Sequence, residues 1–132
     1  GFNTKEETFF MYHFIINPVS RSGRGQKLWN EIKPYLKKKK VPYKAHISDA
    51  PGKIVEIVSE LTSNFSEEYI KLVVLGGDGT MNEVLQGVAD FQHTYIAYIP
   101  TGSSNDLARD LKITGEPIEI LKQILKSKKI YR

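Results

Sequence analysis

Hydrophobic residues are spaced along the chain in two alternating ways, and this alternation predicts strands followed by helices. Short runs rich in aliphatic and aromatic residues occupy residues 12–17, 43–47, 71–75 and 95–99. The run Lys71–Leu75 is continuous rather than alternating, which is typical of a strand buried on both faces of a parallel sheet. We predict a strand over each run, the first ending at Asn17 because Pro18 follows it.

Between these runs, hydrophobic residues recur three and four positions apart, the spacing of a helix that buries one face. The positions with this spacing are Leu28, Ile32, Tyr35 and Leu36; Ile54, Ile57, Val58 and Leu61; Met81, Val84, Leu85 and Val88; and Ile118, Leu121, Ile124 and Leu125. Pro34 falls inside the first set, so that helix is either kinked at the proline or restarted there. With a short helix at 105–111, the order of elements predicts an α/β fold: an open, mostly parallel sheet with helices on both faces.

Three predicted turns connect a strand to the helix that follows it, at residues 17–25, 76–80 and 100–105. In a parallel sheet all such turns lie at the carboxyl edge, where ligands bind. Each turn contains small residues and precedes a helix, so unpaired N–H groups and the helix dipole favour an anion there. Arg21 and Arg24, if they face the site, add positive charge to the first turn. Together the turns predict a polyphosphate ligand, most economically a nucleotide.

Asp78 is an unexpected feature of the second turn, because a carboxylate between glycines repels the phosphates that the turn would otherwise bind. A Mg²⁺ ion shared with the phosphates would offset this repulsion, which favours a metal–nucleotide complex and phosphoryl transfer. Alternatively, Asp78 is the capping residue of the helix that follows, a position that aspartate often takes. The spacing alone leaves both interpretations open.

Neither of the two common phosphate-binding signatures is present, since the sequence lacks G-x-x-x-x-G-K-[ST] and lacks G-x-G-x-x-G after a strand. Instead, Leu75–Val84 (LGGDGTMNEV) resembles the GGDGT-x-NEV motif of diacylglycerol kinase-type lipid kinases, which include the sphingosine and ceramide kinases. Asn17-Pro18 resembles the N-P-x-[SA]-G start of that family, and Pro100–Ala108 resembles its P-x-G-T-x-N-D-x-A segment. NAD kinases share GGDGT, but the other two motifs, in this order, favour the lipid kinases.

The resemblance implies a fold similar to the N-terminal domain of NAD kinase and phosphofructokinase. It also implies transfer of the γ-phosphoryl group of ATP, with Mg²⁺, to the hydroxyl group of a lipid. In the family's pattern the catalytic and metal-binding residue would be Asp78. The nucleotide would be bound by these residues: Asn17, Pro18, Val19, Ser20, Arg21, Ser48, Gly76, Gly77, Asp78, Gly79, Thr80, Met81, Asn82, Glu83 and Ser103.

The sequence departs from the family's pattern at two of these positions. Arg21 stands where the family usually has a glycine, and glycines follow at Gly23 and Gly25 instead, which puts the path of the first turn in question. Ser103 replaces the usual threonine and keeps its hydroxyl group, so we expect little change there.

The resemblance spans nearly the whole chain but only the first half or so of the family's proteins. We therefore expect residues 11–132 to be the nucleotide-binding, N-terminal domain of a truncated lipid kinase, and residues 1–10 to be a tag or a disordered lead. The β-rich domain that follows in the family, which carries the proposed general base and covers the lipid site, is absent from this sequence. The isolated chain is accordingly expected to be inactive as a kinase.

The composition is that of a globular domain, with 132 residues, 40% of them hydrophobic, no cysteine and a net charge of +4. This charge attracts anionic partners. We expect Lys37–Lys40 to be the solvated end of a helix, with a patch for a membrane surface as the alternative. We also expect a cytoplasmic protein, peripheral to the membrane, whose partners are ATP and a lipid with a free hydroxyl and do not include nucleic acid. A second copy of the chain is left open as a partner.

Two other functions stay open at this point. An NAD kinase-like nucleotide kinase domain would share GGDGT but would lack the Asn-Pro start and the N-D-x-A segment. A non-catalytic module that binds anionic ligands on its basic surface would have no need of Asp78.

Overall fold

The strands form one parallel sheet, as the hydrophobic pattern predicts. The structure, a computed structural model, describes residues 11–63, 69–101 and 116–126. Its strands are β1 (Tyr12–Ile16), β2 (Tyr43–Ile47), β3 (Ile70–Gly76) and β4 (Thr94–Pro100). They lie in the order β2-β1-β3-β4, and every neighbouring pair is parallel. The predicted α/β class is therefore confirmed.

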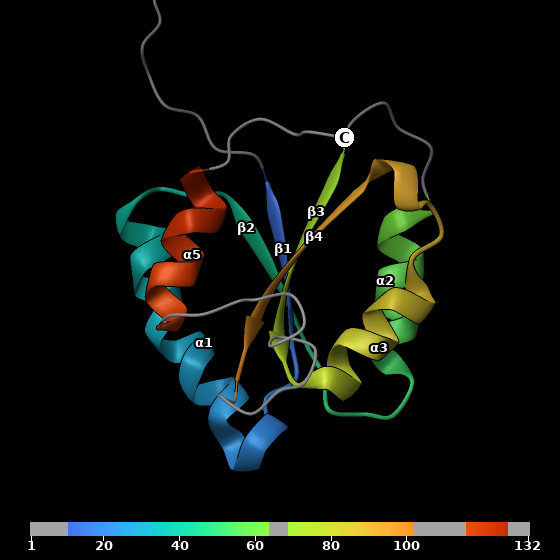
Figure 1. The fold of residues 1–132 in the computed structure, drawn as a ribbon, viewed down its shortest axis with the longest axis horizontal. Helices are drawn as coiled ribbons and strands as arrows, with labels where there is room; N and C mark the ends of the chain where they lie inside the picture. The colour runs from blue at the N-terminus through green and yellow to red at the C-terminus, as the bar shows by residue number, and fades with distance from the viewer. Residues whose placement is uncertain (1–10, 64–68, 102–115, 127–132) are drawn as a thin grey trace, which may run out of the picture.

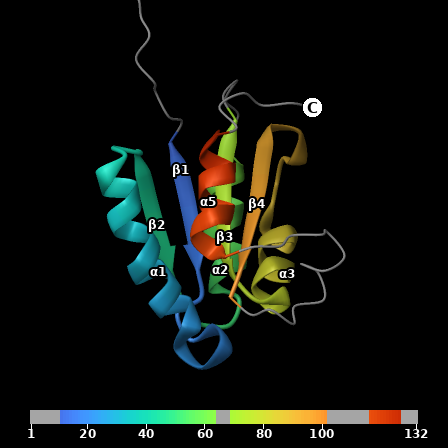
Figure 2. The same ribbon diagram turned by 60° about the vertical axis from the view of Figure 1, so that its left-hand side comes forward.

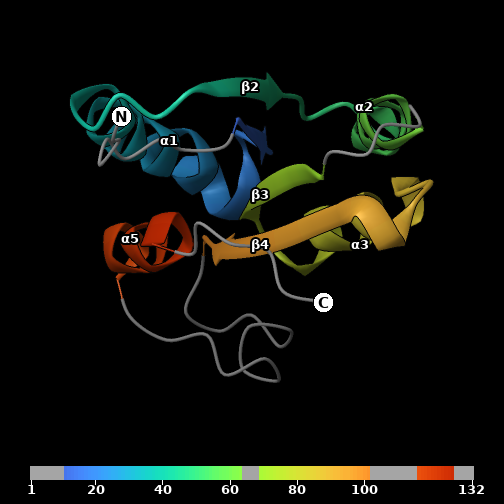
Figure 3. The same cartoon turned by 90° about the horizontal axis from the view of Figure 1, so that it is seen from above.

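Helices cover both faces of this sheet. They are α1 (Ser20–Lys38), α2 (Lys53–Thr62), α3 (Asp78–Gly87) and α5 (Pro117–Lys126), and a 3-10 turn, η1 (Phe91–His93), leads into β4. Seen along its edge in Figure 3, the sheet has α1 and α5 on one side and α2 and α3 on the other. Figure 2 views the molecule from the side on which α1 and α5 lie next to each other.

Each face of the sheet buries its own hydrophobic core. Under α1 and α5, the rings of Phe14 and Trp29 lie 5.2 Å apart, and Tyr43 meets Trp29 edge-on at 5.6 Å. Under α2 and α3, the core contains Val58 and Val84, with Ile15 of β1 beneath them. Contacts between aromatic rings stabilise the folded state in addition to the burial of apolar surface. Because both faces are covered, the central strands β1 and β3 are almost entirely buried.

The start of α1 differs from the prediction. Residues 20–25 are polar and contain two glycines, which predicted a turn, but the helix already begins at Ser20. Its first turn is irregular, since Ser22 and Gly23 have φ angles of 57° and 93°. Pro34 lies inside α1, and the helix continues past it to Lys38. The lysine run is exposed at this helix end, as predicted.

The start of α2 also differs. A serine and an aspartate followed by Pro51 are residues that favour the beginning of a helix. Here, however, the Ser48 hydroxyl accepts the N–H of Ala50 at 3.2 Å in a turn that precedes the helix. The helix begins only at Lys53, after Gly52, which has a φ angle of 79°. The predicted helix at 105–111 and the segments 1–10 and 128–132 lie outside the described residues.

Crossing a lipid bilayer takes a helix of about 20 mostly apolar residues. Within the described ranges, no helix combines the length and the apolar composition needed to cross one.

Candidate functional site

The turns that follow β1, β3 and β4 meet at one edge of the sheet. This is the carboxyl edge, the lower edge in Figure 1, where the strand arrows end. The N–H of Asn17, after β1, donates to the carbonyl of Leu75 at 3.2 Å. The N–H of Thr101, after β4, donates to the carbonyl of Gly76 at 3.1 Å. The first and third turns are therefore bound to opposite sides of the end of β3.

The first turn is closed by Asn17. Its side-chain oxygen accepts the N–H of Val19 at 3.1 Å, and its backbone carbonyl accepts the N–H of Ser20 at 3.3 Å. Gly25 packs against this turn so closely that a Cβ atom there would overlap the carbonyl oxygen of Asn17. The side chain of Val19 is exposed, whereas that of Arg21 lies outside what the structure describes.

A pair of hydroxyl groups joins the first turn to the third. The Oγ atom of Ser20 lies 2.9 Å from the Oγ1 atom of Thr101, and Thr101 is buried. Ser48 stands on the other side of the first turn, where its N–H donates to the carbonyl of Ile16 at 3.1 Å. The structure thus brings Asn17, Ser20 and Ser48 together with the end of β3. Ser103 lies outside the described residues.

The second turn leads from β3 directly into α3. Gly77 occupies the N-cap position in an extended conformation, no side chain caps the helix, and Asp78 is the first helical residue. The interpretation of Asp78 as the capping residue is therefore wrong. Its half-buried carboxylate stands at the positive end of the helix dipole, where negative charge is favoured.

The residues around Asp78 differ in the direction of their side chains. Thr80 is buried against Gly76, where a Cβ atom would come within 2.5 Å of the threonine hydroxyl oxygen. Met81 is buried in the core under α2 and α3. Asn82 is exposed. Glu83 is half-buried, and within the described residues its enclosed Oε1 atom has no hydrogen-bond partner.

Sequence reasoning did not name two residues of this edge, Thr101, which lies in the predicted third turn, and Tyr98. The hydroxyl of Tyr98, which is buried, donates to the Oδ1 atom of Asp78 at 3.3 Å. Both residues belong to β4 or follow it directly, and their partners lie in turns remote in the sequence. The only signal for Tyr98 was a polar group near the end of a strand otherwise expected to be apolar.

The arrangement is suited to binding an anion together with a metal ion. Across the described ranges, no three side chains of histidine, cysteine, aspartate or glutamate gather into a metal site. Carboxylate and hydroxyl oxygens are the ligands that Mg²⁺ prefers, and three turns with a helix N-terminus suit phosphate.

Comparison with known proteins identifies the family. The sequence pattern described as the diacylglycerol kinase catalytic domain matches residues 11–130. The chain belongs to this family. Among the family's members, the Bacillus subtilis (strain 168) protein named as the lipid kinase YtlR is 34% identical over 119 residues, covering 89% of this chain and 38% of that protein. A diacylglycerol kinase of Staphylococcus carnosus (strain TM300) is 32% identical over 111 residues, covering 83% of this chain and 34% of that protein.

Solved structures described as diacylglycerol kinases have the same fold as this chain. A Bacillus anthracis (strain Sterne) structure described as a diacylglycerol kinase superposes with a TM-score of 0.72 at 26% identity, covering 92% of this chain and 43% of that one. The diacylglycerol kinase resemblance seen in the motifs is thus confirmed over almost the whole chain. The chain spans less than half the length of these relatives.

Proposed function

We propose that this chain is the ATP-binding half of a magnesium-dependent lipid kinase, which transfers the γ-phosphoryl group of ATP to a lipid hydroxyl. The observation that carries the proposal is the meeting of three turns at one sheet edge around the Asp78 carboxylate. The family's description, a diacylglycerol kinase catalytic domain, supports the same chemistry.

The residues at this edge fit both ATP and Mg²⁺. Glycines at 77 and 79 leave the backbone accessible, and the N-terminus of α3 favours a phosphate group. Asp78 would hold the metal ion, and Ser20 and Thr101 would supply hydroxyl groups beside the first turn. When bound, Mg²⁺ neutralises charge on the phosphates, which is the main requirement of phosphoryl transfer. The chain's own contribution is then to orient the phosphates and to hold them at a fixed distance from the acceptor.

The proposal extends to the acceptor and to its location. Relatives are named for diacylglycerol and ceramide, both lipids, so we propose a lipid alcohol as the acceptor class. Such an acceptor resides in a membrane, which requires the protein to work at a membrane surface. The general base would come from outside the described residues, in the β-rich domain that the family resemblance implies. An NAD kinase-like activity or a purely binding role is less well supported, because neither accounts for the match along residues 11–130.

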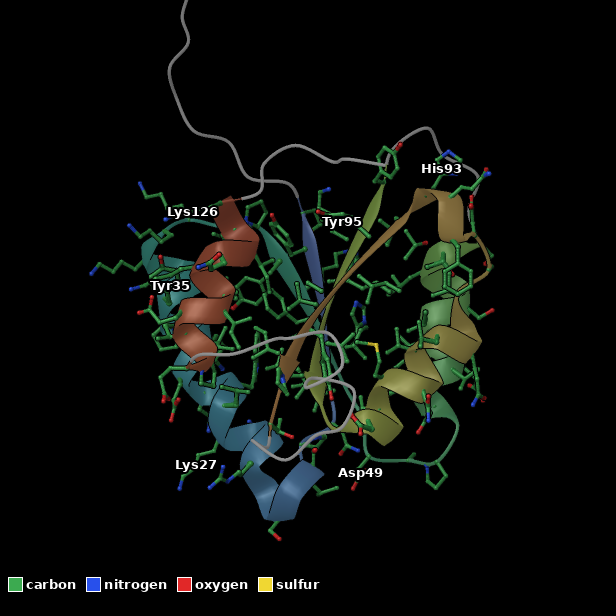
Figure 4. The ribbon with its side chains drawn as sticks, viewed as in Figure 1. Lys27, Tyr35, Asp49, His93, Tyr95 and Lys126 are labelled. Carbon is green, nitrogen blue, oxygen red and sulfur yellow. The ribbon has the colours of Figure 1, made fainter. Side chains whose placement is uncertain are left out.

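The test compares the wild type with Asp78→Asn by calorimetry, titrating ATP with Mg²⁺ and ATP with EDTA. The wild type should bind Mg-ATP more tightly than free ATP. Asp78→Asn should remove that preference, weakening Mg-ATP binding roughly 100-fold, with an unchanged circular dichroism spectrum. Asp49→Asn is the matched control, because it removes the same charge from an exposed residue near the same edge (Figure 4) and should change nothing.

A second measurement addresses the lipid step. The 132-residue chain should release no phosphorylated lipid from radiolabelled ATP and diacylglycerol in mixed micelles. Product formed by this chain alone would contradict the proposed location of the general base. If the wild type bound ATP with the same affinity in the presence and in the absence of Mg²⁺, the proposed function itself would be wrong.

A further inference from the structure

The hydrogen bond between Tyr98 and Asp78 joins a residue of the hydrophobic core to one at the carboxyl edge of the sheet. Tyr98 is only 4% exposed and belongs to the core under α2 and α3. Its backbone is fixed in register opposite Val74 of β3. Its hydroxyl is therefore carried by a ring that has little freedom to move.

Asp78 lies between two glycines at the start of α3. Gly77 and Gly79 flank it and have no side chains to pack against the carboxylate, and a Cβ atom on Gly79 would meet nothing within 4 Å. The Asp78 side chain is half-exposed at the carboxyl edge of the sheet. A side chain in this position loses conformational freedom when it binds a metal ion, and that loss weakens binding.

The contact itself is of a kind that restricts a carboxylate. The Tyr98 hydroxyl lies 3.3 Å from Oδ1 of Asp78. A buried phenol hydroxyl requires a partner, and hydrogen bonds to an ionised acceptor are stronger than those between neutral groups. The bond therefore favours one orientation of the carboxylate before any ligand arrives.

We propose that Tyr98 is a positioning residue that orients the Asp78 carboxylate for the metal ion of a metal–nucleotide complex. This inference rests on the proposed function of the site. Tyr98 acts through Asp78, and its loss should affect the metal-dependent part of nucleotide binding. The effect resembles that of outer hydrogen-bond partners of metal ligands, whose removal costs about 10–100-fold in metal affinity.

The test uses calorimetry on Tyr98→Phe, which keeps the ring and removes only the hydroxyl. Its affinity for Mg-ATP should fall roughly tenfold, while its affinity for ATP in EDTA stays at the wild-type value. Tyr95→Phe is the matched control, because it removes a hydroxyl from the same strand near the opposite edge (Figure 4) and should leave both affinities unchanged. In the Asp78→Asn background, Tyr98→Phe should have no further effect.

Three results would overturn the inference: wild-type Mg-ATP affinity in Tyr98→Phe, an equal loss with and without Mg²⁺, or a full additional loss in the Asp78→Asn background. If the wild type binds ATP equally well with and without Mg²⁺, the proposed function is wrong, and this inference is then wrong as well because it rests on that function. If the wild type requires Mg²⁺ and Tyr98→Phe does not alter that requirement, this inference alone fails.

A measurement without nucleotide checks the contact independently. In urea denaturation, Tyr98→Phe and Asp78→Ala should be non-additive, because each removes the same hydrogen bond. Alanine is used here because the amide oxygen of an asparagine at position 78 could still accept from the Tyr98 hydroxyl. Strict additivity of the two changes in unfolding free energy would show that the contact is absent in solution, which also overturns the inference.

Discussion

The hydroxyl groups of Ser20 and Thr101 lie 2.9 Å apart although 81 positions separate them in the sequence. Ser20 begins α1 and Thr101 directly follows β4, so the contact spans the end of β3, which lies between β1 and β4. Together with the backbone bond from Thr101 to Gly76, it fixes the first and third turns relative to the second.

Replacing Thr101 by valine should loosen this arrangement. The substitution keeps the shape of the buried side chain but removes the partner of the Ser20 hydroxyl. We expect a loss of about 1 kcal/mol in the free energy of unfolding, measured by urea denaturation, and weaker binding of Mg-ATP. Thr101→Ser, which keeps the hydroxyl, should retain the affinity of the wild type. Equal nucleotide affinity in the valine and serine variants would contradict a role for the hydroxyl pair.

Gly87 is expected to be essential for the packing of α3 against α2. A Cβ atom at this position would come within 2.6 Å of the Val55 carbonyl oxygen and 3.0 Å of the Val58 side chain. Gly87→Ala should therefore lower the free energy of unfolding by about 1–3 kcal/mol. Gly79 lies on the same helix with open space around it, so Gly79→Ala should be neutral or stabilise by about 0.5–1 kcal/mol. Two alanine variants with the same stability would refute the proposed close packing.

The pair formed by His13 and His46 predicts a fall in stability on acidification. Their Nδ1 and Nε2 atoms lie 3.1 Å apart on neighbouring strands. Burial lowers the pKa of His13, and the charges of His46 and Lys44 lower it further. Burial, and then the charge of Lys44, lower the pKa of His46 as well. Because both folded-state values lie below the unfolded value of about 6.5, the unfolded chain binds more protons as the pH falls past 6.5.

The free energy of unfolding should accordingly stay constant above pH 6.5 with respect to these two histidines, and it should decline as the pH falls from 6.5 towards 5. Urea denaturation at several pH values should show a shallower decline for the double variant His13→Gln, His46→Gln. His93→Gln serves as the control, because His93 pairs with Asp90 and not with these two histidines. A double variant with the slope of the wild type would rule out the histidine pair as the cause.

The hydrophobic pattern predicted the strands well because burial on both faces of a parallel sheet leaves a distinct signature. The run Lys71–Leu75 lies inside β3, which extends one residue further at each end through pairing with β4. The polar, glycine-containing start of α1 was predicted as a turn, because composition does not show that Gln26 donates to the Pro18 carbonyl at 3.0 Å. This contact between the helix and the residues that precede it helps to hold a helical start that the local composition disfavours.

The candidate site was predictable in part, for a similar reason. Asn17 and the segment Gly76–Asp78 are recognisable because their chemistry lies within a few consecutive residues. Tyr98 and Thr101 reach residues of other turns, and these contacts depend on the order and register of the strands. No local pattern specifies them before the sheet is known.

Strand β4 and the residue that follows it hold two turns at once, Tyr98 through Asp78 and Thr101 through Ser20. Inserting or deleting a residue within Thr94–Pro100 would displace both partners in a single event, and a shift by one position would also turn the tyrosine ring to the opposite face of the sheet. Insertions and deletions among related sequences should therefore occur before this strand, around Phe91–His93, and not within it.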